Sequence, residues 1–202
     1  MKRLVSSALV LGLAVGVMGS AWPAAPERYE LDGAHTNIGF VAKHMLVTNV
    51  RGKFNTFSGH ITLDPQDVTK SSADVTIQVA SIDTDNQRRD DHLRSADFFE
   101  AERYPTIRFV SKRVEKKGND LSLVGDLTIR DVTKEVAIPF ELTGPVSNGG
   151  RKTIGAEGTL RINRFDYGLK WNRAVETGGL VVGEEIRIEL NIQAHTARPA
   201  GN

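Results

Sequence analysis

The sequence contains no cysteine in its 202 residues. Disulfide bonds, thiol catalysis and cysteine-based metal sites are therefore excluded. Aromatic residues make up only 6% of the chain, too few for the two aromatic girdles of an outer-membrane barrel. Lysine and arginine total 26 against 25 acidic residues, so the basic excess typical of a nucleic-acid-binding protein is also missing. No repeat, low-complexity segment or linker divides the chain, and we expect one domain.

The only long apolar run stands at the beginning of the chain. Lys2 and Arg3 precede an apolar stretch over residues 4–18, and small residues follow up to Ala21. This is the layout of a secretory signal peptide, and the run is shorter than the ~20 residues of a membrane-spanning helix. We expect a signal peptide over residues 1–21, with cleavage after Ala21 or else after Ala24 or Ala25. The mature domain, residues 22–202, would then be periplasmic or secreted.

From residue 28 onward, apolar and polar residues alternate with period two, as in strands buried on one face. The pattern predicts regular strands at residues 184–196, 153–163, 121–129, 136–142 and 75–79, and less regular ones at 37–46, 52–64 and 106–116. Turn-forming clusters at 117–120 and 147–150 separate neighbouring strands. Pro139 has no N–H to donate, so an edge or a bulge is expected there. About eight short strands indicate an all-β sandwich or barrel.

Residues 81–105 interrupt the alternation and are highly charged. Thr84 to Gln87 has the Thr-x-x-Gln form of a capping box, which predicts a short helix at about 86–95. A turn is expected around Asp97, with the following two phenylalanines folding over an apolar surface. On the helix Arg88 or Arg89 could meet His92, but no third catalytic partner is identifiable. We expect Arg89 or Asp90 to hydrogen-bond the rim of the sheet, with contact to a ligand head group as the alternative.

The sequence has five histidines but no metal-binding pair among them. His35, His44, His60, His92 and His195 form neither an HxH nor an HExxH pattern, so we predict no metal site. Ser58-Gly59 lacks the context of a nucleophile elbow, so no catalytic residue is predicted.

If the strands close into a barrel, its interior is either filled or hollow. The inward rows contain small residues among the large ones, which either interdigitate with them or leave a lumen: Ala73, Gly125, Ala156, Gly158 and Ala194. The residues expected to line such a lumen are Phe40, His44, Phe54, Phe57, Ile61, Phe109, Leu127, Ile138, Phe140, Leu160 and Ile188. Those expected to close one end are Met45, Phe98, Phe99 and Trp171. The pattern itself leaves both interiors open.

Several ordered motifs resemble those of the YceI-like family of polyisoprenoid-binding periplasmic proteins. The matching segments are Asp32-x-x-His35-Thr36-x-Ile38-x-Phe40, Lys43-His44-Met45, Val50-Arg51-Gly52-Lys53-Phe54 with Phe57-Ser58-Gly59, Ser81-Ile82-Asp83-Thr84, Asn86-x-x-Arg89-Asp90-x-His92-Leu93 with Asp97-Phe98-Phe99, Tyr104-Pro105-x-Ile107-x-Phe109, Gly125-Asp126-Leu127-Thr128-Ile129 and Asn163-Arg164-x-Asp166-Tyr167-Gly168. The resemblance covers about residues 29–195. One departure is Asp131, where the family more often has glycine; aspartate tolerates left-handed turn geometry.

The resemblance implies an extended eight-stranded antiparallel β-barrel, lipocalin-like, with a short helical insertion at about 86–100. It also implies an open lumen, and we therefore expect a non-catalytic carrier of a long-chain isoprenoid, of polyprenyl or quinone type, or of a similar amphiphilic lipid. No cofactor is expected apart from this ligand, and no nucleic-acid partner. Transient membrane contact and a homodimer stay open. The alternatives are an envelope stress or interaction protein with a filled barrel, and an enzyme of isoprenoid lipid metabolism.

Overall fold

The structure is a computed structural model that describes residues 25–45, 47–173 and 181–198. The expected signal peptide, its cleavage site and the Thr177-Gly178-Gly179 segment lie outside the described residues. Within the described part of the chain, no helix has the length and apolar character needed to cross a membrane.

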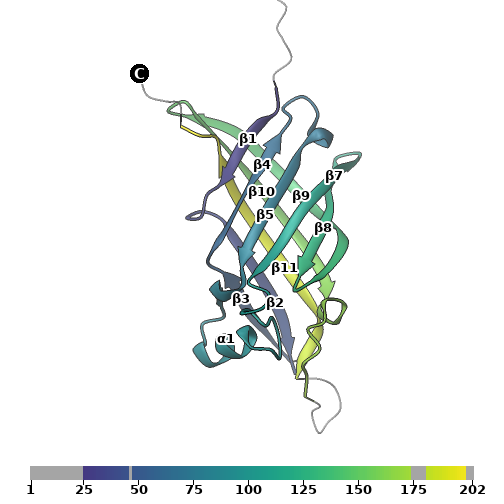
Figure 1. Ribbon diagram of the computed structural model, residues 1–202. Coiled ribbons are helices and arrows are strands. Elements are labelled where there is room, and N and C mark those ends of the chain that lie inside the picture. The colour runs from purple at the N-terminus through teal and green to yellow at the C-terminus, as the bar shows by residue number, and fades with distance from the viewer. Residues whose placement is uncertain (1–24, 46, 174–180, 199–202) are drawn as a thin grey trace, which may run out of the picture.

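The described residues form one antiparallel sheet with a single short α-helix (Figure 1). The strands are β1 (Glu27–Leu31), β2 (Asn37–His44), β3 (Thr48–Phe54), β4 (Phe57–Leu63), β5 (Ser72–Gln78), β6 (Ile82–Asp83), β7 (Thr106–Lys117), β8 (Asp120–Ile129), β9 (Val132–Asn148), β10 (Arg151–Asn163) and β11 (Val182–His195). The helix α1 spans Gln87–Arg94, and the 3₁₀ turns are η1 (Val68–Lys70), η2 (Val79–Ser81) and η3 (Arg164–Tyr167). The sheet order is β1-β4-β5-β7-β8-β9-β10-β11-β2-β3-β6, and an additional pairing joins β1 to β11.

These eleven segments amount to eight strand positions around a closed barrel. One edge of β11 pairs with β1, where Glu30 faces His195, and further along with β2, where Ile38 faces Leu190. Strands β1 and β2 are therefore one interrupted strand. The pairs β3/β4 and β5/β6 are interrupted in the same way, because β4 pairs with β1 and β5 while β3 pairs with β2 and β6. The predicted eight-stranded antiparallel barrel is confirmed.

The two predicted hairpin turns are present, and Pro139 lies at an edge, as predicted. Gly118 and Gly149 adopt left-handed φ angles of 63° and 57° in the β7–β8 and β9–β10 hairpins. The β9–β10 ladder ends where Phe140 faces Gly158, so Pro139 lies just beyond it and its missing N–H removes no bond to β10. In the β8–β9 turn the left-handed residue is Arg130 (φ 57°), not Asp131.

The interruption between β1 and β2 is organised by the Asp32 carboxylate. Its Oδ1 accepts the N–H of Ala34 at 2.9 Å, and its Oδ2 accepts from the side-chain amide of Gln193 at 3.1 Å. The Nδ1 atom of His35 lies 2.7 Å from the same Oδ2. The hydrogen bond with His35, followed by the one from Ala34, lowers the pKa of Asp32 to about 2. The loop is thereby tied to β11, against which both halves of the strand pair.

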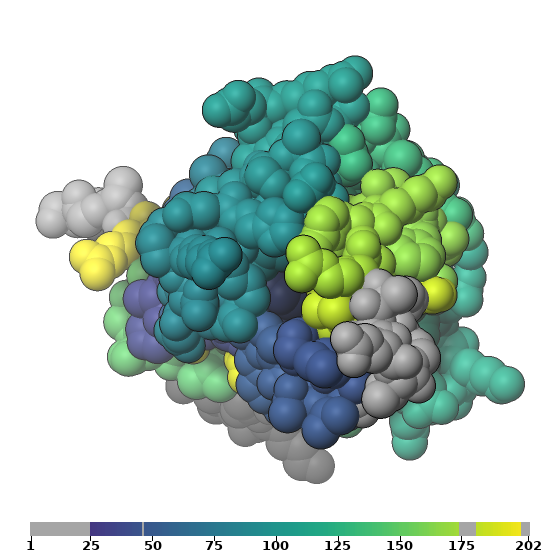
Figure 2. All heavy atoms as spheres, turned by 90° about the horizontal axis from the view of Figure 1, so that it is seen from below, coloured from purple at the N-terminus to yellow at the C-terminus, as the bar shows by residue number. Residues whose placement is uncertain are grey.

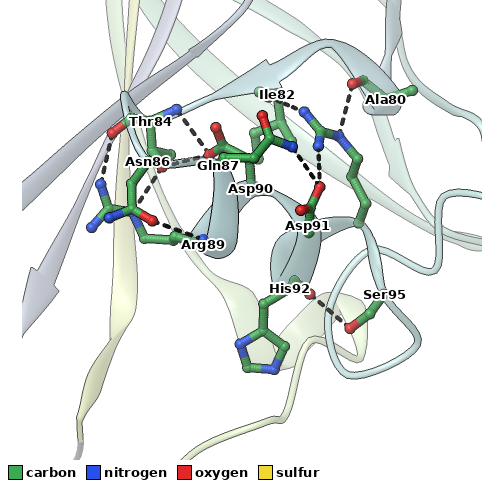
Figure 3. Close-up of polar contacts among 11 residues, drawn as sticks. Ala80, Ile82, Thr84, Asn86, Gln87, Arg89, Asp90, Asp91, His92 and Ser95 are labelled. Carbon is green, nitrogen blue, oxygen red and sulfur yellow. Dashed lines mark hydrogen bonds and ion pairs between the residues drawn. The ribbon is translucent and has the colours of Figure 1, made fainter.

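Helix α1 and the loop after it lie at the lower end of the barrel (Figures 1 and 2), opposite the end where the described chain begins and stops. The helix is fixed to the sheet through Thr84, which directly follows β6 (Figure 3). The N–H and the hydroxyl of Thr84 donate to Oδ1 of the buried Asp90 at 3.0 and 2.5 Å, and Arg89 donates to the hydroxyl and the carbonyl of Thr84 at 2.7 and 2.6 Å. Arg89 therefore donates to the rim and Asp90 accepts from it, so the expected hydrogen bonds are present.

Two details of the sequence-based helix differ from the structure. The N-cap is Asn86, whose side chain accepts the N–H of Arg89, so the capping-box interpretation of Thr84 is wrong. Thr84 instead lies two residues before the cap and binds Asp90, because the chain enters the helix from β6 at that point. His92 is hydrogen-bonded to neither arginine; its Nε2 lies 2.8 Å from Oδ2 of Asp97.

We predict that Asp32→Asn lowers the free energy of unfolding at pH 5 by about 1 kcal/mol, because an amide accepts these bonds less well than a carboxylate. The folded-state pKa of Asp32 lies below its ordinary value of 3.8, so the carboxylate stabilises the fold above that value and loses this effect as the pH falls toward about 2. Urea unfolding of both proteins at pH 5 and pH 2.5 measures the difference. It should shrink at the lower pH; an equal or larger difference there would contradict the assignment.

We predict that Asp90→Asn destabilises the protein by about 2 kcal/mol, because the amide leaves the buried N–H and hydroxyl of Thr84 poorly paired. The matched control is Asp91→Asn on the exposed side of the same helix, where loss of the pair with Arg94 should cost less than about 0.5 kcal/mol. Chemical denaturation of the two variants tests this. Equal effects would show that the contact between Thr84 and Asp90 does not hold the helix.

Candidate functional site

The barrel encloses an apolar tunnel with a volume of about 270 Å³. Its walls come from β1 to β5, β7 to β11, α1 and the segments near η1 and η3, so the tunnel follows the barrel along most of its length. It extends from Leu31, Leu63 and Leu142 at the upper end to Phe98 and Val182 at the lower end. Because the strands alternate, apolar side chains point inward and charged ones point to water. The volume is close to the lower end of the range for small-molecule sites.

Apolar side chains close the upper end of the tunnel. Tyr29, Leu63, Ile154 and Ala194 form a buried cluster there, and Leu142 of the tunnel wall packs against it. The Tyr29 hydroxyl donates to Oε2 of Glu27 at 2.9 Å, and burial raises the pKa of Tyr29 to about 12. This end is therefore part of the hydrophobic core.

The lower end is built from segments that do not belong to the barrel strands. Leu93 of α1 and the following Phe98 and Phe99 line the tunnel. Outside them, the ring of His92 makes edge contacts with Phe98 and Trp171, with ring centroids 5.1 and 4.8 Å apart. Figure 2, which views this end from below, shows a hollow between the helix, the β2–β3 hairpin and residues 164–173. We refer to this hollow as the lower mouth.

The buried cation Arg164 forms part of the tunnel wall near this mouth. Its side chain donates to the carbonyl oxygens of Gly183 (2.9 Å), Trp171 (2.9 Å), Val182 (3.1 Å) and Leu169. Only 3% of the residue is exposed, and removal from water lowers the pKa of its guanidinium, while the nearby Glu184 raises it. The four bonds join the segment after β10 to the start of β11.

Most of the residues predicted to line the lumen or to close its end do line the tunnel: Phe40, Phe54, Ile61, Phe98, Phe99, Phe109, Leu127, Ile138, Phe140, Leu160 and Ile188. The tunnel wall does not include His44, Met45, Phe57 or Trp171. His44 ends β2 and Met45 follows with a left-handed φ of 50°, so the alternation stops there and Met45 is 46% exposed. Phe57 packs against the core cluster, and Trp171 lies beside His92 at the lower end. Contact of these residues with a ligand stays a prediction.

Some of the small residues of the inward rows leave space in the barrel, and others allow close packing. Ala73, Ala156 and Gly158 line the tunnel. Ala194 is fully buried in the upper cluster. A Cβ atom on Gly125 would lie 2.4 Å from the carbonyl oxygen of Val110, so this glycine permits close approach of two strands. The barrel is therefore filled at its upper end and hollow below.

Sequence reasoning did not assign Arg164 to the site, although it stands in the Asn163-Arg164 motif. Charged residues are usually exposed, and nothing in the local pattern indicates that this one is buried. Leu93 and Val182 were also missed. They lie in or beside irregular segments, where alternation does not indicate whether a side chain points into the barrel or out of it. Within the described residues, no group of three histidine, aspartate or glutamate side chains is placed to bind a metal ion.

Comparisons with known proteins agree with this geometry. A family model described as YceI-like domain matches residues 29–194. The UPF0312 protein SAS2572 of Staphylococcus aureus is 36% identical over 167 residues, which cover 82% of this chain and 95% of that protein. The UPF0312 protein SERP2314 of Staphylococcus epidermidis is 37% identical over 168 residues, with coverage of 82% and 96%.

Solved structures with the same barrel include BcnA of Burkholderia cenocepacia, with a TM-score of 0.69, 29% identity and coverage of 81% of this chain and 98% of that one. The YCEI protein of Campylobacter jejuni gives a TM-score of 0.67 at 32% identity, with coverage of 77% and 90%. A polyisoprenoid binding domain from Saccharophagus degradans, implicated in plant cell wall breakdown, shares the fold with a TM-score of 0.63 at 16% identity and coverage of 84% and 98%. Since the family model spans the whole barrel from β1 to β11, this chain belongs to the YceI-like family.

Proposed function

We propose that the protein is a non-catalytic carrier that holds a long-chain isoprenoid, or a similar amphiphilic lipid, inside its tunnel. The observation that supports this most directly is the tunnel itself, which has apolar walls, a closed upper end and a hollow at the lower end. Each CH₂ group moved from water into such a space gains about 0.8 kcal/mol, so a chain of several prenyl units would be retained against escape into water.

The shape of the space favours an extended chain over a compact ligand. A volume of about 270 Å³ is distributed along most of the barrel, so its cross-section is small. The binding of a polyisoprenoid by the Saccharophagus degradans domain of the same fold agrees with such a ligand. The leader-like sequence at residues 1–21 leads us to propose the periplasm as the place where the carrier acts.

The same observations favour a carrier over the other two candidate functions. A protein that acts only through its outer surface has no need of an apolar tunnel through its core. An enzyme using residues 86–97 would need polar side chains directed at the ligand. The side chains of Arg89 and Asp90 instead bind Thr84 (Figure 3), and Asp91 pairs with Arg94.

The direct test is native purification of the mature protein followed by mass spectrometry of extracted lipids. We expect a prenyl lipid in stoichiometric amount. The measurement should be repeated after delipidation and incubation with vesicles that contain a labelled polyprenyl lipid. Repeated recovery of no lipid, from cells and from vesicles, would overturn the carrier function.

We predict that Ala156→Phe strongly reduces lipid recovery, because the added ring occupies the tunnel that Ala156 lines. The matched control is Ala137→Phe, which adds the same ring at an exposed position on β9 and should leave lipid recovery unchanged. Thermal unfolding of the lipid-free proteins provides a second measurement. A ring placed in empty space should not destabilise the fold, whereas overpacking a filled core would cost about 1–3 kcal/mol. Equal lipid recovery in both variants would argue against binding in the tunnel.

A further inference from the structure

The tip of the β2–β3 hairpin carries apolar side chains that face water. Val47 is 79% exposed and Met45 is 46% exposed. Among the described residues one other large apolar side chain is exposed: that of Val146, which pairs with Thr153 beside the buried cluster at the upper end. A single exposed apolar side chain needs no explanation. Two in one turn, with Leu46 between them in the sequence, mark this tip as a contact surface.

The turns that join β7 to β8, β8 to β9 and β9 to β10 contain glycine or polar residues, as exposed turns usually do. Their left-handed residues are Gly118, Arg130 and Gly149. In the β2–β3 turn the left-handed residue is Met45, with a φ of 50°. Glycine adopts this conformation more readily than methionine does. Neither the geometry of the turn nor its exposure to water therefore accounts for the apolar residues.

Hydrogen bonds hold the tip beside the lower end of the tunnel. The N–H of Val47 donates to the carbonyl oxygen of His44 at 3.0 Å, and the N–H of Met45 donates to that of Val181 at 2.9 Å. The next residue, Val182, lines the tunnel and faces His44 across the β2–β11 ladder. The exposed side chains of the tip therefore stand at the border of the lower mouth, where Figure 2 shows the hairpin beside the hollow.

We propose that the lower mouth docks on the surface of a lipid bilayer, with Met45 and Val47 inserted between the lipid head groups. Docking of this kind rests on the proposed function, because it supplies the step at which the carrier exchanges its ligand. Each CH₂ group of an isoprenoid tail that enters water adds to the cost of transfer. The opening of the tunnel must therefore meet the membrane if the tail is to pass directly from one to the other, and the apolar tip stands beside that opening.

The charge of the hairpin suits a membrane that contains anionic lipids. No aspartate or glutamate occurs in residues 33–63. Lys43 is exposed just before the tip, and Lys170 is exposed on the segment 164–173 that borders the mouth. A lysine near an anionic bilayer surface strengthens binding about fivefold. The exposed carboxylates of Glu184 and Glu185 at the start of β11 offset part of this attraction, so the apolar tip makes the larger contribution.

A direct test uses the absence of cysteine from the sequence. Val47→Cys in the delipidated mature protein provides one thiol, at the tip, for a polarity-sensitive fluorophore. Vesicles of phosphatidylcholine and phosphatidylglycerol should raise the emission of this label several-fold, because acyl chains replace water around it. The matched control is Val146→Cys with the same label, which should not respond. Equal responses at the two positions, or none at either, would overturn docking through this mouth.

Flotation of the unlabelled protein with the same vesicles measures docking independently. Val47→Asp should lower the bound fraction roughly tenfold, because a charge replaces the inserted apolar group. Met45→Asn keeps the turn, since asparagine tolerates the left-handed conformation, and should weaken binding in the same direction. Lys43→Gln should weaken binding only to vesicles that contain phosphatidylglycerol. Val146→Asp should float as the wild-type protein does. Flotation that neither tip variant reduces would contradict the assignment.

Transfer of a labelled polyprenyl lipid between vesicles separates docking from carrying. Val47→Asp should slow the transfer and leave unchanged the amount of lipid held at equilibrium, because the tunnel is intact. Vesicle binding without any uptake of lipid would overturn the carrier function and leave the docking surface in place. If Val47→Asp instead changes the oligomeric state measured by sedimentation and leaves flotation unaltered, the tip is an interface between two copies of the chain, and membrane docking is overturned.

Discussion

The pairing of β11 with two separate segments on one edge is the constraint on which the site depends. Because β11 pairs with β1 near its carboxyl end and with β2 along the rest, the sheet closes on itself, and the inward side chains of ten strands face a common interior. Closure also requires the chain between β1 and β2 to leave the sheet and return to it in register. The Asp32 carboxylate and Thr36 accomplish this by binding the side chain and the main chain of Gln193 on β11. A barrel opened at this seam would expose its apolar rows to water and lose the tunnel.

The two ends of the barrel are built on different physical principles. At the upper end, close packing of Tyr29 with its neighbours fills the interior, so this end gains stability from burial. At the lower end, inserted segments are joined to the strands and to one another by arginines that donate to main-chain carbonyls. Arg94 reaches Ala80 and Ile82, and Arg130 reaches Gly168 and the carboxylate of Glu100. Directional bonds of this kind hold separate segments in place without filling the space between them, which is what an open mouth requires.

Much of the barrel wall could be predicted from the sequence, because period-two alternation reports directly which side chains share a face. Phe109 and Leu127 illustrate this: both stand on regular strands, and both line the tunnel. The prediction failed where the backbone leaves the strand geometry. His44 was expected on the inward row with Phe40, but the strand ends at that residue, and the left-handed turn at Met45 stops the alternation. Thr84 was interpreted as an N-cap because it matches a local motif, but the motif does not show that Thr84 binds Asp90 instead. The burial of Arg164 depends on carbonyl groups up to nineteen positions away in the chain, which no local pattern encodes.

The difference between the apolar wall and the residues around the lower mouth also bears on how a carrier would release its ligand. Transfer of a prenyl tail from a bilayer to the tunnel exchanges one hydrocarbon environment for another and is close to neutral in free energy. The wall therefore retains the lipid against water but not against a membrane. Any preference for one lipid over another in the same membrane must then come from the length of the space below the upper cluster and from the groups at the mouth. Retention against water and discrimination between lipids would therefore be set by different parts of the molecule.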